Sequence, residues 1–290
     1  MLSRKSFLGR LLREPRVWLG GLFFLALLSV ALGAGVWAPH APNEQDLMAI
    51  ELPPMWMEGG EAGFPLGTDS LGQCILSRLM HGAQVVLLIA TLAPLGAACI
   101  GTLLAIAAGY CGGWVDWVVA RWVEMWLAFP AIVMALVLMV ALSPGVHNVI
   151  IAIVVVDWTR FCRVLRAEVA VIRSKPYVAA ARITGAQHLG LLLRDVWPGI
   201  VPTLISLISL EMAIAIVAES ILSFVGMSVG TDVPTWGVMM ADGLKAVFTA
   251  PWVLVAPVVC MIATVLAATF LGDGLRRAAD VRLLGRGEAA

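Results

Sequence analysis

The chain has 290 residues, of which 61% are hydrophobic and 13% are charged, and its mean hydropathy is +0.95. Soluble domains carry about twice that charged fraction, so the composition excludes an ordinary soluble protein and predicts one embedded in a lipid bilayer. The 19 basic and 19 acidic residues cancel, which argues against a nucleic-acid partner, and the five scattered cysteines form no C-x-x-C pair. The length accommodates about six spans of ~20 residues in one membrane domain.

The beginning of the chain predicts a membrane anchor followed by an extracytoplasmic loop. Residues 1–16 hold five Lys or Arg and one Glu, and an apolar run covers 17–38. A cleaved signal peptide would have a shorter apolar core, so we expect a cytoplasmic segment over 1–16 and a first span over 17–38. The next stretch, 39–69, contains six acidic residues and no Lys or Arg. We therefore expect a periplasmic loop with an amphipathic entry over 39–84.

Residues 85–272 are expected to form a five-span core. The second span is rich in small residues that recur every four positions, a pattern that favours close approach of another helix. These residues are Ala93, Ala97, Gly101, Ala105 and Gly109. The third span is interrupted at Phe129-Pro130, and the fourth apolar run is too short to cross alone, so it must continue through Arg166. The five spans cover about 85–109, 118–142, 149–166, 200–224 and 252–271.

The distribution of basic residues gives the expected orientation. Nearly all Lys and Arg fall in the first terminus, in alternate loops and in the tail over 273–290, whereas the opposite loops offer only Arg78 and Lys245. By the positive-inside rule, the chain is an all-α polytopic membrane protein with six transmembrane helices and both termini cytoplasmic.

A polar, basic stretch over 174–198 interrupts two strongly apolar runs. Ser174 can N-cap a helix, Gly185 can end it, and Pro198 can end the segment that follows, so we expect two short helices. Such a stretch is either a solvated loop between spans or an element that docks into a groove of another protein.

Enzyme chemistry is not indicated anywhere in the sequence. A phosphate-binding G-x-x-x-x-G-K-[ST] loop requires a lysine after a glycine, and none of Lys5, Lys175 and Lys245 follows one. The four histidines lack metal-binding spacing, and no G-x-S-x-G motif occurs. We therefore expect no catalytic residues, no metal site and no cofactor bound by this chain.

Four acidic residues fall within or close to the apolar spans: Glu124, Asp157, Glu211 and Glu219. Because a carboxylate in hydrocarbon costs several kcal/mol, each should face a bundle interior, a cavity or an interface. Glu124 and Asp157 can simply pair with Arg121 and Arg160 near the cytoplasmic ends of their spans. Glu211 and Glu219 can line a translocation path and meet a cationic group, or they can be protonated or hydrogen-bonded between helices.

The polar stretch resembles the cytoplasmic coupling loop of binding-protein-dependent ABC importer permeases, whose signature is E-A-A, three residues, Gly, nine residues, I-x-L-P. Ala180, Ala181, Gly185 and Pro198 match it in the right spacing. Ala179, Asp195 and Trp197 depart from it at the Glu, Ile and Leu positions.

Longer segments are similar to the C-type permeases of the dipeptide, oligopeptide and nickel importer family. They are PLGTDSLGQCILSRLMHGAQVVL, AGYCGGWVDWVVARWVEMWLAFP, ESILSFVGMSVGTDVPTWGVMMADG and LGDGLRRAADVRL, between Pro65 and Leu283. Family members usually show G-R-D where Gly72-Gln73-Cys74 stand here, and Asp157 and Glu211 look unusual for the family.

This resemblance implies a type I ABC importer fold with a cytoplasmic coupling helix between spans four and five, in the bacterial inner membrane. It also implies a homologous B-type permease as heterodimer partner, two ATPases that bind ATP and Mg, and a periplasmic solute-binding protein. The implied ATPase-coupling residues are Tyr177, Val178, Ala179, Ala180, Ala181, Arg182, Gly185, Ala186, Leu189 and Pro198. Dipeptides or oligopeptides, nickel or another metal chelate, opines and small glycosides all stay open as solutes. A secondary transporter is the alternative from outside the family.

Overall fold

The computed structural model describes residues 14–230 and 232–287, and this part of the chain is built of helices without a β-strand. The all-α class predicted from the sequence is confirmed. In chain order the helices are α2 (Pro15–Trp37), α3 (Ile75–Cys111), α4 (Gly113–Leu127), α5 (Ala131–Leu142), α6 (Val146–Arg173), α7 (Pro176–Ile183), α8 (His188–Leu191), the π-helical turn η1 (Leu192–Val196), α9 (Trp197–Phe224), α10 (Trp236–Lys245) and α11 (Pro251–Gly287).

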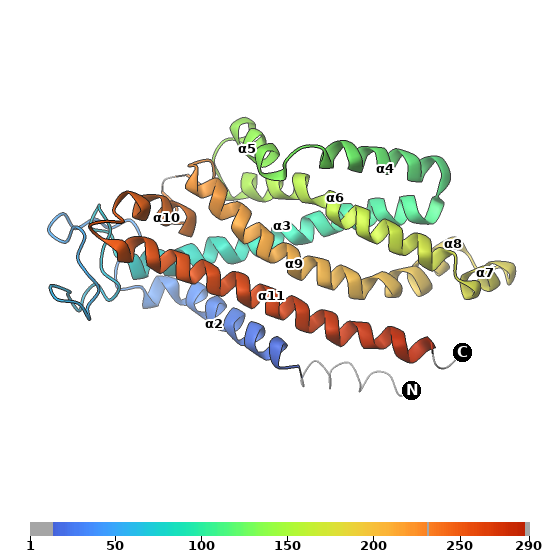
Figure 1. The fold of residues 1–290 in the computed structure, drawn as a ribbon, viewed down its shortest axis with the longest axis horizontal. Coiled ribbons are helices and arrows are strands. Elements are labelled where there is room, and N and C mark those ends of the chain that lie inside the picture. The colour runs from blue at the N-terminus through green and yellow to red at the C-terminus, as the bar shows by residue number, and fades with distance from the viewer. Residues whose placement is uncertain (1–13, 231, 288–290) are drawn as a thin grey trace.

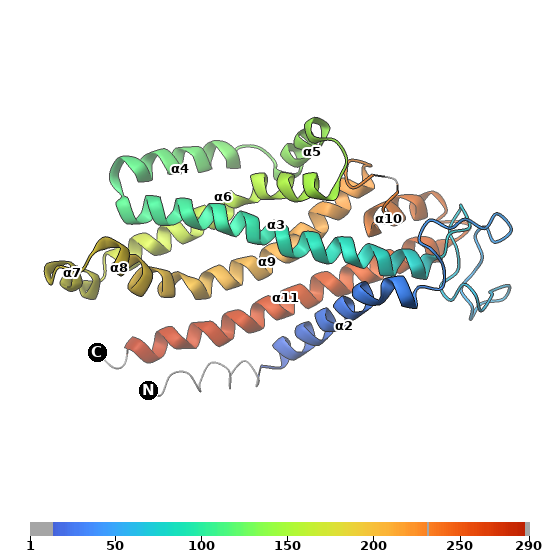
Figure 2. The same ribbon diagram turned by 180° about the vertical axis from the view of Figure 1, so that it is seen from behind.

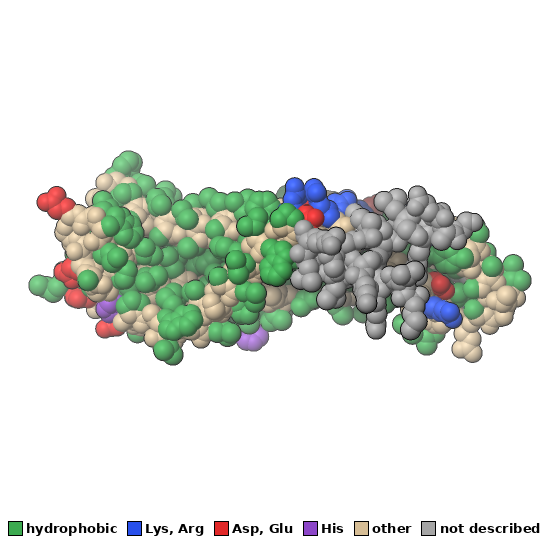
Figure 3. Space-filling view, turned by 90° about the horizontal axis from the view of Figure 1, so that it is seen from below, with side chains coloured by type: hydrophobic (Ala, Val, Ile, Leu, Met, Phe, Trp, Pro, Cys, Tyr) green, Lys and Arg blue, Asp and Glu red, His purple; other side chains and the backbone are tan. Residues whose placement is uncertain are grey.

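The long helices run side by side along the longest axis of the molecule (Figures 1 and 2). The loop over 39–74 and α10 lie at one end, and α7 and α8 lie at the other, together with the C-terminal end of α11. On the face drawn in Figure 3, acidic side chains gather at the loop end, whereas Lys and Arg side chains lie farther along the bundle. The segments expected on opposite sides of a bilayer therefore lie at opposite ends of the structure.

Four helical stretches in the described part are long and apolar enough to cross a membrane: Pro15–Trp37, Ile75–Cys111, His188–Phe224 and Pro251–Ala278. A fifth crossing arises if α4 and α5 count as one broken span. α6 is a continuous helix, as expected from its short apolar run, but its C-terminal half is rich in charged residues and does not read as a span by composition.

The third expected span, 118–142, is not one helix. α4 ends at Leu127, α5 begins at Ala131, and the two axes are bent by 85°. Pro130 explains the break, because proline has no N–H to donate and disfavours a helical conformation at the preceding Phe129. Pro130 has an extended backbone, with φ −61° and ψ 125°, and serves as the N-cap position of α5.

A second feature not foreseen lies between the expected spans 200–224 and 252–271, where the chain forms the ten-residue helix α10. Thr235 caps this helix by accepting a hydrogen bond from the Val238 N–H. The indole of Trp236 is buried and donates to the Leu79 carbonyl oxygen at 3.1 Å, so α10 packs against the beginning of α3.

The packing of α3 against α6 forms the centre of the bundle. The small residues of α3 are buried, and a Cβ added at Gly101 would lie 2.5 Å from both the Trp158 carbonyl oxygen and the Phe161 Cβ. At Gly109 an added Cβ would lie 2.7 Å from the Arg166 carbonyl oxygen. The predicted role of this stripe as a close helix-packing surface is confirmed.

The loop over 39–74 is folded onto the beginning of α3 by a buried ion pair between Asp69 and Arg78. The other Asp69 carboxylate oxygen accepts hydrogen bonds from the N–H groups of Leu71 and Gln73, both at 2.9 Å. Asp69 thus caps a turn of the loop, whereas α3 itself begins later, after Cys74.

Candidate functional site

The polar stretch between α6 and α9 folds into two short helices, as predicted. α7 ends where Gly185 adopts a positive φ of 84°, and the Ala186 N–H reaches back to the Ala181 carbonyl oxygen at 3.0 Å. This is the Schellman arrangement that a glycine at a helix end permits. The chain then reverses into α8, so the two helices form a compact tip at the end of the bundle (Figure 1).

Two details of the expected stretch are wrong. The Ser174 hydroxyl donates to the Val171 carbonyl oxygen at 2.8 Å, so it bonds to the end of α6 and does not cap α7. Pro198 does not end a segment, because it lies in the first turn of α9. The helical stretch is continuous from His188 through the π-helical turn η1 to Phe224. Pro198 has no N–H to donate, and a helix can accept a proline in its first turn without losing a hydrogen bond. The π-helical turn η1 lies directly before it and keeps the stretch helical.

The tip presents apolar side chains to its surroundings. Ile183 is 87% exposed, and Tyr177 and Leu189 are also exposed. Val178, in contrast, is fully buried and anchors α7. Ala179, Ala180, Gly185, Ala186 and Pro198 are exposed, and Ala181 is partly buried. Arg182 lies in α7, and its side chain falls outside the described part of the structure.

A contact that the sequence did not predict holds the tip against the rest of the bundle. The Tyr110 hydroxyl lies 2.8 Å from Nδ1 of His188, which joins the end of α3 to the beginning of α8. The two rings also meet edge to face, with centroids 5.8 Å apart. The residues are 78 positions apart and belong to no shared motif, so no local sequence signal indicated the pair.

The four intramembrane acidic residues fall into different environments. Glu124 pairs with Arg121 at 2.5 Å on the exposed surface of α4, as the topological interpretation predicted. Glu219 is fully buried between α9 and α10, where the Ser223 hydroxyl donates to its carboxylate at 2.5 Å. Ser220 and Ser223, whose hydroxyl groups donate to Glu219, belong to α9 itself, and Glu219 does not line the membrane cavity described below.

Asp157 and Glu211 come together at one arginine. The Arg160 Nη1 lies 3.4 Å from the Glu211 carboxylate, and its Nε lies 3.8 Å from the Asp157 carboxylate. Both carboxyl groups are buried, since only 6% of the Asp157 side chain and 4% of the Glu211 side chain are exposed. The Arg160 side chain is 36% exposed. Arg160 therefore joins α6 to α9, a cross-helix pairing absent from the sequence interpretation.

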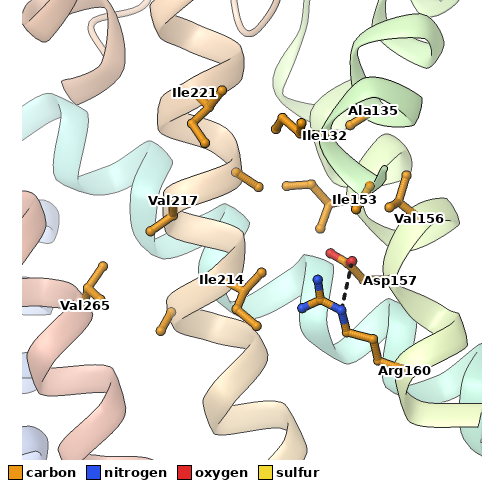
Figure 4. A pocket seen from close by; sticks show the side chains of 13 residues that line it. Ile132, Ala135, Ile153, Val156, Asp157, Arg160, Ile214, Val217, Ile221 and Val265 are labelled. Carbon is orange, nitrogen blue, oxygen red and sulfur yellow. Dashed lines mark ion pairs between the residues drawn. The ribbon is translucent and has the colours of Figure 1, made fainter. Parts of the chain in front are cut away.

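This charged cluster lies at one side of an otherwise aliphatic cavity of about 340 Å³ between α5, α6 and α9 (Figure 4). Asp157 and Arg160 are the only charged residues that line it within the described part of the chain. The remaining walls are Ala131, Ile132, Ala135, Ile153, Val156, Ala213, Ile214, Val217, Ala218, Ile221 and Val265. In the described residues, no group of three or more His, Cys, Asp or Glu side chains is placed to hold a metal ion.

Comparison with known families identifies the family to which the chain belongs. Residues 101–285 match the family described as binding-protein-dependent transport system inner membrane component, and the chain belongs to this family. Residues 4–54 match the N-terminal TM domain of oligopeptide transport permease C. The predicted membership in the importer permeases is confirmed, and with it a place in the bacterial inner membrane.

Individual relatives extend the similarity over nearly the whole chain. The di/tripeptide transport system permease protein DppC of Pseudomonas aeruginosa is 36% identical over 266 residues, which cover 91% of this chain and 88% of that protein. The dipeptide transport system permease protein DppC of Escherichia coli K12 is 37% identical, with 93% and 90% covered. The glutathione transport system permease protein GsiD of Pectobacterium atrosepticum is 32% identical, with 96% and 91% covered.

Proposed function

We propose that this chain is one of two permease subunits of an ATP-binding-cassette importer that moves short peptides into the cytoplasm. A homologous permease is its membrane partner, two ATPases bind ATP and Mg, and a periplasmic binding protein delivers the solute. The observation that carries the proposal is the exposed apolar tip of α7 and α8 at the end of the bundle opposite the 39–74 loop. The peptide-transporting relatives support the solute class.

The proposed mechanism is alternating access driven from the tip. α6 runs directly into the tip and α9 leads out of it, so a displacement of α7 and α8 is applied to both helices at once. These two helices also carry most of the residues that line the membrane cavity. Closure of the ATPases is therefore transmitted to the cavity by rigid helices, as in hinge and shear transitions. We propose six spans with both termini cytoplasmic for this arrangement, with α4 and α5 together forming the third.

The first experiment tests whether the tip binds an ATPase. Ile183→Asp places a charge on the most exposed apolar side chain of α7 and should lower ATPase affinity by about 2 kcal/mol or more, which is roughly thirtyfold, if Ile183 is an interface anchor. Phe248→Asp is the matched control, because Phe248 is 99% exposed and lies between α10 and α11 at the other end. Co-purification of the ATPases with the permease pair is the measurement. Equal retention of the ATPases by both variants would contradict the proposed docking.

The second experiment separates the solute classes and the transport mechanism. Uptake of a dipeptide by the complete complex in proteoliposomes should require ATP, both ATPases and the binding protein. ATP-independent uptake by this chain alone would favour the secondary transporter. A ligand screen on the cognate binding protein distinguishes peptides from nickel or other metal chelates, opines and glycosides.

A further inference from the structure

The membrane cavity combines aliphatic walls with a single charged cluster, and the cluster has an unusual charge balance. Asp157 and Glu211 contribute two carboxylates, and Arg160 contributes one guanidinium. When all three are ionised, one negative charge stays uncompensated. The described residues that line the cavity include no further Lys, Arg or His. An unpaired charge among apolar side chains costs several kcal/mol, so the excess negative charge is balanced either by a proton on one carboxyl group or by a cation that enters the cavity.

The geometry shows which carboxylate is available for that cation. Glu211 is held by Arg160 through both carboxylate oxygens, at 3.4 and 3.5 Å, and does not line the cavity. Asp157 lines the cavity, its oxygen lies 3.8 Å from the guanidinium, and its carboxylate points from α6 toward α9 in Figure 4. Asp157 is therefore the less tightly paired acid and the one that a solute can reach.

We propose that the cavity is a solute-binding site in the translocation path, in which Asp157 accepts the ammonium group of a short peptide with aliphatic side chains. Glu211 is a positioning residue that holds Arg160 against α9 and so keeps Asp157 facing the cavity. The volume of about 340 Å³ lies at the small end of ligand pockets, which span ~300–1,000 Å³, and so fits a solute of dipeptide size. This inference rests on the proposed importer function.

The test compares two solutes that differ only in the ammonium group: an aliphatic dipeptide and its analogue without the amino group. Uptake is measured in proteoliposomes that contain the complete transporter and binding protein. Asp157→Asn should lower kcat/KM for the dipeptide at least tenfold and leave the analogue within about twofold, since only the dipeptide loses a charge-assisted contact. The selectivity of the binding protein cancels, because the same binding protein serves every variant. Direct binding of both solutes to the purified permease complex gives the same comparison if the binding protein rejects the analogue.

Two further variants control the interpretation. Asp157→Glu keeps the charge and should restore most of the preference for the dipeptide. Asp116→Asn is the matched control, because Asp116 also pairs with an arginine of α6, Arg166 at 2.9 Å, but lies outside the cavity. It should leave the preference unchanged.

Several results would overturn the proposal. An equal loss of both solutes in Asp157→Asn would make Asp157 a structural residue, and unchanged kinetics would mean that the cavity binds no ammonium. Failure of Asp157→Asn to co-purify with the partner permease would mean that Asp157 serves assembly of the complex and not the solute. If the wild-type complex transports neither solute, the proposed peptide import itself fails, whereas wild-type transport without an effect of the variant refutes only this site.

Discussion

The close packing of α3 on α6 makes a quantitative prediction for Gly101→Ala. The added Cβ would lie 2.5 Å from the Trp158 carbonyl oxygen and from the Phe161 Cβ, and 3.0 Å from the Cys162 nitrogen. Two of these three atoms belong to the backbone of α6, so no side-chain rotation can relieve the overlap. The two helices must move apart, which also loosens the contacts around them.

The expected loss of stability follows from two opposing terms. Overpacking of a close-packed interior costs about 1–3 kcal/mol. Alanine is the better helix former by about 1 kcal/mol, which offsets part of that cost. Gly101→Ala should therefore lower the free energy of unfolding by up to about 2 kcal/mol. Gly35→Ala in α2 is the matched control, since no atom lies within 4 Å of its added Cβ. It receives only the favourable helix term.

The assay is unfolding of the purified protein in mixed micelles, followed by helix content as denaturing detergent is added. The two variants should differ by about 1–3 kcal/mol, with Gly101→Ala the less stable. If Gly101→Ala is as stable as Gly35→Ala, then the helices do not approach as closely as described and the reasoning from the small-residue stripe is wrong.

Two other contacts lead to separate predictions. Tyr110→Phe removes the hydroxyl that bonds to α8 and should lower solute-stimulated ATP hydrolysis about two- to tenfold, since one hydrogen bond contributes about 0.5–1.5 kcal/mol. Basal ATP hydrolysis should not change. An equal fall in the basal and the stimulated rates would contradict a positioning role for Tyr110. Arg78→Met leaves Asp69 buried without its cation and should lower the free energy of unfolding by about 3–5 kcal/mol, measured by thermal unfolding. The double variant Asp69→Asn with Arg78→Met should recover part of this loss, and no recovery would argue against the pair.

Part of the candidate site could be predicted because its signals are local. Gly185 indicated the end of α7 since a left-handed residue favours glycine at a helix end. The small residues of α3 recur with the period of a helix face, so their role in packing was also readable. The 85° bend between α4 and α5 was only partly foreseen. Pro130 marks a break, but the angle depends on what each half packs against.

The amino-acid sequence by itself determined the helical membrane class, the two short helices of the tip and the membership in the importer permeases, because hydropathy, helix-end residues and motif spacing all act over a few turns of the chain. Only the tertiary structure decided that Arg160 pairs with Asp157 and also with Glu211, which lies 51 residues after Arg160. It also decided that Tyr110 bonds to His188. Such pairs arise where helices distant in sequence cross, and no local period specifies which faces meet. The grouping of two carboxyl groups around one guanidinium beside the cavity follows from that crossing.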